Sequence, residues 1–506
     1  MKQIKFLTPA IFLILTFSSC TKLNEDLYSD LAADRARAEI VSKVNFTALL
    51  DQVYRDMDNP FPGYDQAFGL QEMSSDEMVV PSRPSGWDNN GIFREMHQHT
   101  WTQDNSLIKS VWLNLNRGVF DASNILEFKP PANVAAEARF LRAYFMYEIV
   151  DLFNQLPFRE VGFNLLEKPK VIKGKEAIDF VISEVEAVMK DLPATAPDWK
   201  ASKNAANGFL TRLYLNRGVY ADPGNPTFAS TDLDKVIQHA DAITGKQLNF
   251  YWDNFGPNNG QISKEIVFSV EAIGGTRAHG LQFQWYATLP GEIKLSASGG
   301  GWNGLCTLKE FYNKYETNDI RRYYESPITK PVYGYNVGFL VGQQYDQNGQ
   351  PIPNVNLTPE VPTIIGATLY NGIRPLKYIP DLGPNINRPD NDWILIRWAD
   401  VLLMKAEALL RKGDEPAARA IVNQIRTSRN VAAFGTLNLD NLLDERGRET
   451  YWEGMRRRDL IRFKKFNQPW ELKPASQPYR NVFPIPREDV LANPNLTQNP
   501  GYPGAR

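Results

Sequence analysis

The chain has 506 residues and a formal net charge of −2 at pH 7. It lacks the excess of lysine and arginine that draws proteins to nucleic acid or to anionic lipid, so the charge balance argues against such partners. Apolar residues make up 43% of the sequence and the mean hydropathy is −0.39, which indicates a soluble body with a sizeable core.

The only long apolar run lies at the N-terminus and predicts a signal peptide over residues 1–19. The run is too short to span a membrane as a helix, and small serines precede Cys20, the pattern of a lipoprotein signal. We therefore expect acyl chains at Cys20, with residues 20–42 as lipid anchor and polar tether. An ordinary secretory signal is the alternative. Cys306 is the only other cysteine, so we expect no internal disulfide.

Apolar residues recur at helical spacing in three blocks: from about Ser106 to Ala221, from Trp393 to about Arg429, and from Leu442 to about Phe463. From about residue 250 to 388 the chain is rich in Gly, Pro, Asn and aromatic residues, and only short runs such as 265–270 and 375–379 resemble strands. This pattern predicts a mostly α-helical fold with an irregular, loop-rich lobe that contains short strands.

A string of leucine, basic residue and glycine recurs within the helical blocks, at Leu215–Tyr220 and at Leu410–Asp414. Glycine allows a tight turn between helices, and the alanines after Gly413 allow close packing, as in tetratricopeptide hairpins. Generic helical hairpins are the alternative. A similar string at Leu115–Val119 has nothing that stops a helix. We predict one domain over residues 43–506, with a helical solenoid at about 43–249 and 389–470 and the lobe at about 250–388.

Longer motifs follow one another along the chain. They are Arg139–Phe145 with Asp151–Pro157, Ile396–Ala408, Glu445–Arg462, Phe483–Pro486 and Gln498–Tyr502. In this order they resemble the signatures of the SusD/RagB family, which is named for a starch-utilisation system. The resemblance implies a tetratricopeptide-like fold and a lipoprotein at the outer face of the outer membrane. It also implies that the protein binds an oligosaccharide and covers a SusC-like TonB-dependent transporter.

The charged run in the third motif also has a plain physical interpretation. Asp444 and Arg448, and likewise Glu453 and Arg457, are four residues apart and can pair on one helix face. We expect these pairs to be exposed, and the family motifs to hold the scaffold together while binding residues lie elsewhere.

Sugar sites combine aromatic faces with planar hydrogen-bonding side chains. A polar loop with this composition contains Asp76, Arg83, Trp87 and Asp88, and the resemblance implies sugar contacts from a loop at this place. A second candidate stretch contains Tyr286, Trp302 and Asn303, where neighbouring glycines leave room around an aromatic ring. For each aromatic residue, a place in the core is the alternative.

Enzymatic and metal chemistry have little support. His97 and His99 alternate as on a strand, but no third ligand follows, so a structural pair is favoured and we expect neither metal nor cofactor. A glycoside hydrolase could use two carboxylates such as Asp76 and Glu77 without a short motif, although neighbours on a strand face opposite ways. A scaffold that binds only protein is the third possibility. The leading hypothesis is a non-catalytic, surface-exposed glycan-binding lipoprotein that delivers sugar to its transporter.

Overall fold

The computed structural model describes residues 39, 41, 43–84, 86–162, 164, 166–297 and 299–504. The expected signal peptide, Cys20 and nearly all of the expected tether lie outside these residues. Residues Phe46–Arg506 form one compact unit, which contains every element discussed below. Among the described residues, no helix is both long enough and apolar enough to cross a lipid bilayer.

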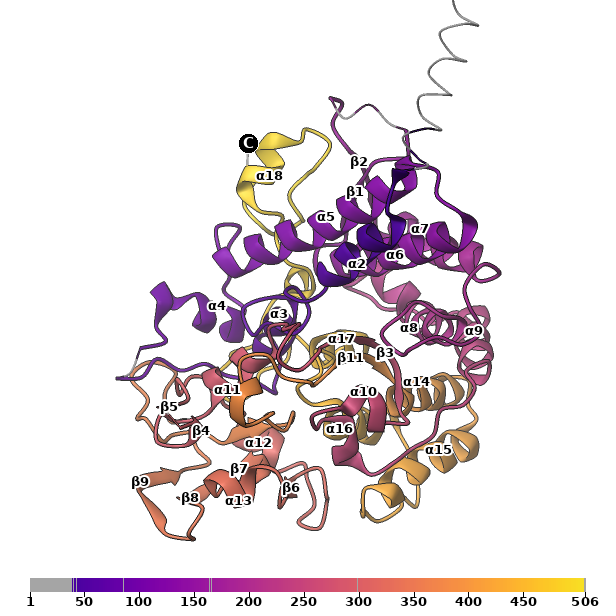
Figure 1. Ribbon diagram of the computed structural model, residues 1–506. Coiled ribbons are helices and arrows are strands. Elements are labelled where there is room, and N and C mark those ends of the chain that lie inside the picture. The colour runs from indigo at the N-terminus through magenta and orange to yellow at the C-terminus, as the bar shows by residue number, and fades with distance from the viewer. Residues whose placement is uncertain are drawn as a thin grey trace, which may run out of the picture. The chain divides into compact units, whose positions relative to one another are not determined.

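Long helices pair in sequence to form the larger part of this unit (Figure 1). From α5 to α9 each helix packs against the next, α9 packs against α14, and α14 packs against both α15 and α16. Helices from two distant stretches of chain thus form one continuous array. The mostly α-helical, tetratricopeptide-like architecture predicted from the sequence is therefore confirmed. The helices of the array are α5 (Ser106–Glu127), α6 (Ala132–Phe153), α7 (Gly174–Val188), α8 (Lys203–Ala221), α9 (Ser230–Asp241), α14 (Trp398–Arg411), α15 (Glu415–Ser428), α16 (Leu439–Thr450) and α17 (Arg456–Arg462).

Local sequence signals explain where several helices begin. The side chain of Asn105 accepts a hydrogen bond from the amide of Leu107, and the Asp414 side chain accepts one from Ala417. These caps satisfy amides that have no partner within the helix. Between α14 and α15, Gly413 has a φ of 90°, a left-handed conformation that glycine adopts without strain. The turn expected at this glycine is confirmed.

The other glycines of the repeated strings have a different role. Gly118 lies inside α5, where a Cβ atom would come within 2.5 Å of the Phe145 ring on α6. Gly218 lies in the last turn of α8, and its Cβ would come within 2.1 Å of the Thr227 carbonyl oxygen. The inter-helix turn expected at Gly218 is therefore wrong, because this glycine permits a close approach within a helix.

Short antiparallel strands organise the lobe and its junction with the helices. The strand-like run at 265–270 is confirmed as β3, whereas the run at 375–379 only overlaps a strand of three residues. The paired strands are β1 (Gln155–Phe158) with β2 (Lys170–Lys173), β3 (Ile266–Val270) with β11 (Trp393–Arg397), β4 (Lys294–Ser296) with β5 (Gly299–Gly300), β8 (Gly342–Tyr345) with β9 (Pro351–Leu357), and β6 (Tyr323–Tyr324) and β10 (Arg374–Leu376) on either side of β7 (Val337–Leu340).

Shorter helices complete the unit. They are α2 (Phe46–Arg55), α3 (Ala67–Met73), α4 (Ile92–Gln98), α10 (Asn259–Ile262), α11 (Leu281–Thr288), α12 (Lys309–Tyr312), α13 (Thr329–Tyr333) and α18 (Arg487–Ala492), with single 3₁₀ turns at Asn89–Gly91, Tyr251–Asn254, Gly383–Asn385 and Pro478–Asn481.

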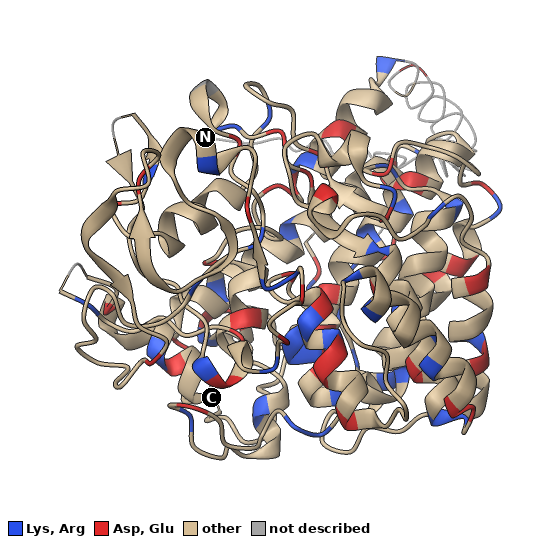
Figure 2. Ribbon diagram, turned by 90° about the horizontal axis from the view of Figure 1, so that it is seen from below, with Lys and Arg blue, Asp and Glu red and all other residues tan. Residues whose placement is uncertain are grey.

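Buried ion pairs join the helical array to the lobe. The Glu449 carboxylate on α16 forms ion pairs with Arg397 at 2.7 Å, Arg429 at 2.9 Å and Arg321 at 2.8 Å. All four side chains are fully buried. Figure 2 shows acidic and basic residues interspersed along the helices rather than separated by sign. The family motif at Glu445–Arg462 therefore holds several elements together, as expected.

The exposed ion pairs predicted within this motif are wrong. Arg448 pairs with Glu445 and is 8% exposed, while Arg457 pairs with Asp151 of α6 and is fully buried. Glu453 pairs with Arg397 at 2.8 Å. Helical spacing shows which charges share a face, but here the rest of the protein covers that face and supplies the partners.

Candidate functional site

Three aromatic rings form an exposed row on the lobe. Trp302 stacks on Tyr286 with ring centroids 5.3 Å apart and on Phe283 with centroids 6.0 Å apart, at interplanar angles of 21° and 26°. Trp302 and Phe283 are each 44% exposed, whereas Tyr286 is half-buried. Phe283 and Tyr286 lie one turn apart on α11, so they share a face, while Trp285 between them points into the core. We call these three rings the aromatic row.

The backbone around Trp302 is fastened to α11. The amide of Trp302 donates to the Tyr286 carbonyl, and the amides of Asn303 and Gly304 donate to Leu289 and Ala287 at 2.9 and 2.6 Å. A Cβ at Gly301 would lie only 1.9 Å from the Leu289 carbonyl oxygen. The glycine run is thus required for close backbone approach, and it fixes the position of the Trp302 indole.

Trp87 packs against the backbone of the segment that carries Trp302. Its indole Nε1 donates a hydrogen bond of 2.7 Å to the Trp302 carbonyl, and its ring lies where a Cβ on Gly304 would be, at 2.3 Å. The ring also contacts Tyr64 and Phe93, with centroids 5.8 Å from each. The structure thus brings together the two tryptophans that the sequence singled out from separate stretches.

Polar side chains lie near the row. The Tyr286 hydroxyl donates to Asn387 Oδ1 at 3.1 Å, and the Tyr370 hydroxyl donates to Glu292 Oε1 at 2.8 Å. Burial raises the pKa of both tyrosines, so their hydroxyls stay neutral donors at physiological pH. Amide, carboxylate and phenol groups therefore accompany the apolar rings. Sequence reasoning missed Phe283, Asn387, Glu292 and Tyr370; only Phe283, one turn before Tyr286, had a local signal.

The remaining residues singled out from the sequence have protein partners. Asn303 donates to the Leu369 carbonyl at 2.7 Å and accepts from Arg374 at 2.8 Å, while Arg83 donates to the Asn371 carbonyl at 2.9 Å. Both are buried and hold the loop at 368–371. Asp88 is exposed and pairs with Arg94 at 3.2 Å. Direct sugar contacts by these residues stay predictions.

Asp76 is buried away from the row, in an ion pair. Its carboxylate receives Arg456 at 2.6 and 2.8 Å. Burial opposes its ionisation, but the guanidinium outweighs this effect and holds the pKa of Asp76 below its ordinary value. Its neighbour Glu77 is also buried, against Glu72, and burial raises the pKa of Glu77 far above its ordinary value. Both carboxyl groups are thus enclosed within the protein, and neither lies in the strand that the sequence suggested.

The two neighbouring histidines are structural, as favoured from the sequence. His97 contacts the carbonyls of Met78 and Glu471 at 3.1 and 3.0 Å, and His99 contacts Ser476 and the Ser74 carbonyl at 2.9 and 2.8 Å. They lie at the end of α4 rather than on a strand. In the part of the chain that the structure describes, no group of three His, Cys, Asp or Glu residues is placed to hold a metal ion.

These features define a helical-repeat protein with an irregular lobe and an exposed aromatic row. Comparison with known proteins is consistent with that class. Residues 27–215 match the family model described as "Starch-binding associating with outer membrane", and residues 264–502 match the model of the SusD family. The chain belongs to the SusD/RagB family.

Known relatives span nearly the whole chain. The starch-binding protein SusD of Bacteroides thetaiotaomicron is 26% identical over 495 residues, which cover 87% of this chain and 86% of that protein. A SusD superfamily structure from Parabacteroides distasonis superposes with a TM-score of 0.71 at 19% identity, covering 91% and 99% of the two chains. Surface glycan-binding protein A from Bacteroides uniformis gives a TM-score of 0.68 at 18% identity, covering 90% and 98%. At these identities the structural likeness shows the shared fold.

Proposed function

We propose that this protein binds an oligosaccharide on the aromatic row and does not catalyse its breakdown. The exposed stack of Phe283, Trp302 and Tyr286 carries the proposal, because sugar rings present C–H faces that pack against aromatic rings. Asn387 and Glu292 offer hydrogen-bonding groups for sugar hydroxyls. The names of a starch-binding relative and a glycan-binding structural neighbour support the same ligand class.

We further propose that the protein is anchored outside the cell through acyl chains at Cys20 and passes its glycan to a SusC-like TonB-dependent transporter. The signal sequence and the family motifs support this proposal, as does the description of the matching family as associating with the outer membrane. Cys20→Ala is expected to release the protein from membrane fractions. Retention of the variant in the membrane would contradict the anchor.

Delivery to a transporter predicts a stable association. Purification of the lipidated protein from its own membranes is expected to recover a TonB-dependent barrel as a partner. Its absence from a gently solubilised preparation would contradict delivery but would leave sugar binding untouched.

A glycan array followed by calorimetry tests the binding site. Trp302→Ala is expected to weaken binding by about twofold to tenfold, which corresponds to about 0.5–1.5 kcal/mol for an aromatic contact. Tyr345→Ala is a matched control, because Tyr345 is also 44% exposed but lies on β8 outside the row. Equal affinities of both variants and the wild type would overturn the site. Release of new reducing ends from bound glycans would overturn the non-catalytic assignment.

A further inference from the structure

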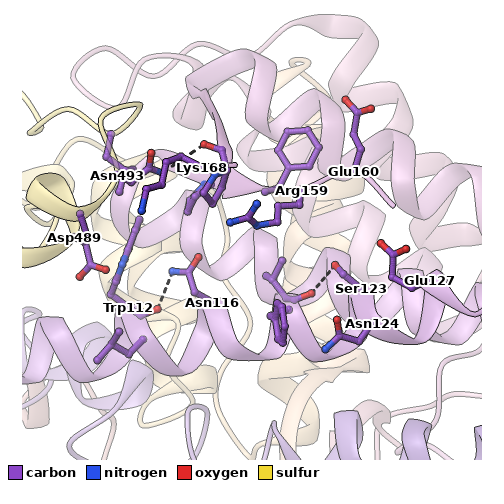
Figure 3. Close-up of a pocket in the computed structure, with 18 of the residues that line it drawn as sticks. Trp112, Asn116, Ser123, Asn124, Glu127, Arg159, Glu160, Lys168, Asp489 and Asn493 are labelled. Atoms are coloured by element: carbon purple, nitrogen blue, oxygen red, sulfur yellow. Dashed lines mark hydrogen bonds between the residues drawn. The ribbon is translucent and has the colours of Figure 1, made fainter. Parts of the chain in front are cut away.

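A concave surface lies apart from the aromatic row. A groove of about 560 Å³ runs between α5, the loop that joins β1 to β2, and α18 (Figure 3). This volume is in the range of small-ligand sites. Figure 1 shows α5, β1 and α18 in the upper part of the compact unit and α11 with β4 and β5 lower down, on its left side. The groove is thus a separate surface from the proposed glycan site.

One face of α5 forms the floor of the groove. Leu113 and Phe120 are each 48% exposed, a large fraction for such apolar side chains. Asn116 and Asn124 come from the same face, since they are three and four residues from these apolar positions. The floor therefore combines an exposed aromatic ring with planar amides, as the aromatic row does.

Two cations border this floor. Arg159 and Lys168 both come from the loop that joins β1 to β2, and Figure 3 shows both side chains directed over the groove. Among the described residues, neither has a carboxylate within ion-pairing distance. Within the described part of the chain, the Arg159 guanidinium donates hydrogen bonds from Nη1 to the carbonyls of Asn164 and Glu167. This contrasts with the core, where Arg321, Arg397 and Arg429 all pair with carboxylates.

Two of the three acidic residues of the lining have partners of their own. Glu160 pairs with Lys170 at 2.7 Å, and Glu127 accepts the Gly162 amide at 2.7 Å. In Figure 3 both acids lie at the far end of the groove from Lys168. Asp489 is the third acidic residue of the lining, and burial raises its pKa above the ordinary value. The groove therefore presents two cations without a paired carboxylate, among the described residues, above an apolar floor.

We propose that this groove is a second saccharide site, specific for an anionic sugar such as a uronic acid or a sulfated residue. The apolar face of the sugar ring lies on Phe120 and Leu113, its hydroxyls meet Asn116 and Asn124, and its anionic group meets the two unpaired cations. A neutral sugar can accept hydrogen bonds from these cations but gains no charge-assisted contact. The site thus recognises a ligand that differs in charge from one held by the aromatic row.

Calorimetry with trigalacturonate, a sulfated disaccharide and neutral maltotriose tests this proposal. The full-length protein carries Trp302→Ala, so that binding at the row is weakened and the groove contributes a larger share of the measured heat. We expect the two anionic probes to bind more tightly than maltotriose, and their affinity to fall as salt is added, because exposed charges are screened. Binding by one anionic probe alone would identify carboxylate or sulfate as the preferred group.

Single substitutions in the loop locate the binding. Lys168→Gln is expected to weaken anionic binding about threefold to fivefold. Lys170→Gln removes the same charge two residues further along, at the start of β2, but its Nζ pairs with Glu160, so we expect little change. Phe120→Ala tests the floor independently of charge. Failure of both anionic probes to bind at millimolar concentration, or equal affinities of the two lysine variants, would overturn the proposal. Neither result bears on neutral glycans at the aromatic row, which wild-type protein and Trp302→Ala test separately.

Discussion

The indole Nε1 of Trp87 donates a hydrogen bond of 2.7 Å to the backbone carbonyl of Trp302, across 215 positions of sequence. The bond couples a loop near the N-terminal helices to the segment that presents the aromatic row. Trp87 can therefore influence ligand binding through the position of Trp302, without any contact of its own with the sugar.

Trp87→Phe tests this coupling, because it keeps a ring on Gly304 but removes the donor. We expect the free energy of unfolding to fall by about 1 kcal/mol. We also expect calorimetry to show weaker glycan affinity, because Trp302 is held less firmly. Trp252→Phe is the matched control, since Trp252 Nε1 donates a comparable bond of 2.8 Å to the Ile320 carbonyl. The control is expected to lose stability while its glycan affinity is unchanged. Identical affinity in both variants would show that the Trp87 bond does not position the row.

Gly304→Ala tests the close packing behind the row. The new Cβ would lie 2.3 Å from the Trp87 ring, so ring or backbone must shift at a cost of about 1–3 kcal/mol. Gly299→Ala is the control, because nothing lies within 4 Å of its Cβ. Thermal unfolding is expected to show a lower Tm only for Gly304→Ala. An unchanged Tm would mean that the two segments can separate without cost.

Much of the helical scaffold could be predicted from the local sequence pattern. The positions at which a helical run ends or becomes a strand could not. The run Trp393–Arg397 continues the apolar character of α14, yet it forms β11 because β3 offers a partner far away in sequence. Within the third helical block, α16 ends at Thr450 and α17 begins at Arg456. Trp452 and Gly454 between them adopt positive φ, which ends the helical path. Pairing and chain reversal of this kind depend on tertiary contacts.

The candidate site likewise contains residues that the sequence indicated and residues that only the fold reveals. Composition drew attention to Trp87, Trp302 and Tyr286, because glycine and polar residues surround them. Nothing local revealed that Asp76 is buried, since its partner Arg456 lies 380 positions away. Asn387 and Glu292 come from loops without a motif, and only the folded chain brings them near the rings.

Glu449→Gln tests the buried ion network. Removal of one charge leaves Arg321, Arg397 and Arg429 with less compensation in a water-free interior, so we expect a loss of about 3–5 kcal/mol in the free energy of unfolding. Asp51→Asn breaks an exposed pair with Arg55 and is expected to cost less than about 0.5 kcal/mol. Urea denaturation of both variants measures the difference. Similar losses would show that burial adds nothing to these pairs.

Acid is expected to unfold the protein through its buried, arginine-paired carboxylates. Burial opposes the ionisation of Glu445 and Glu407, but neighbouring arginines lower the pKa of each to about 2, from an ordinary value of 4.5. The stability that each contributes is present above pH 4.5 and is lost as the pH falls from 4.5 towards 2. Denaturation curves across this range are expected to show a steep loss in the wild type. Glu407→Gln, which cannot titrate there, is expected to show a shallower one, and parallel curves would contradict the assignment.

Glu72 is expected to have the opposite effect on stability. Its carboxyl group is buried against that of Glu77, and among the described residues Glu72 Oε2 and Glu77 Oε1 find no hydrogen-bond donor. Burial raises the pKa of Glu72 to about 7, so the folded protein holds a proton that the unfolded chain releases near pH 4.5. The contribution of Glu72 to stability is therefore largest below pH 4.5 and falls as the pH rises from 4.5 to about 7.

Glu72→Gln removes this titratable group. The glutamine keeps a side-chain oxygen that can accept the hydrogen bond which the Gly454 amide donates to Glu72 at 2.7 Å. Its new amide can also donate to Glu77, which lacks a donor at Oε1. We expect the variant to be more stable than the wild type at pH 8 by on the order of 1–3 kcal/mol, with a smaller difference at pH 5. Chemical denaturation at both values measures this. A variant that is less stable at pH 8 would show that the ionised carboxylate, rather than the proton, stabilises the fold.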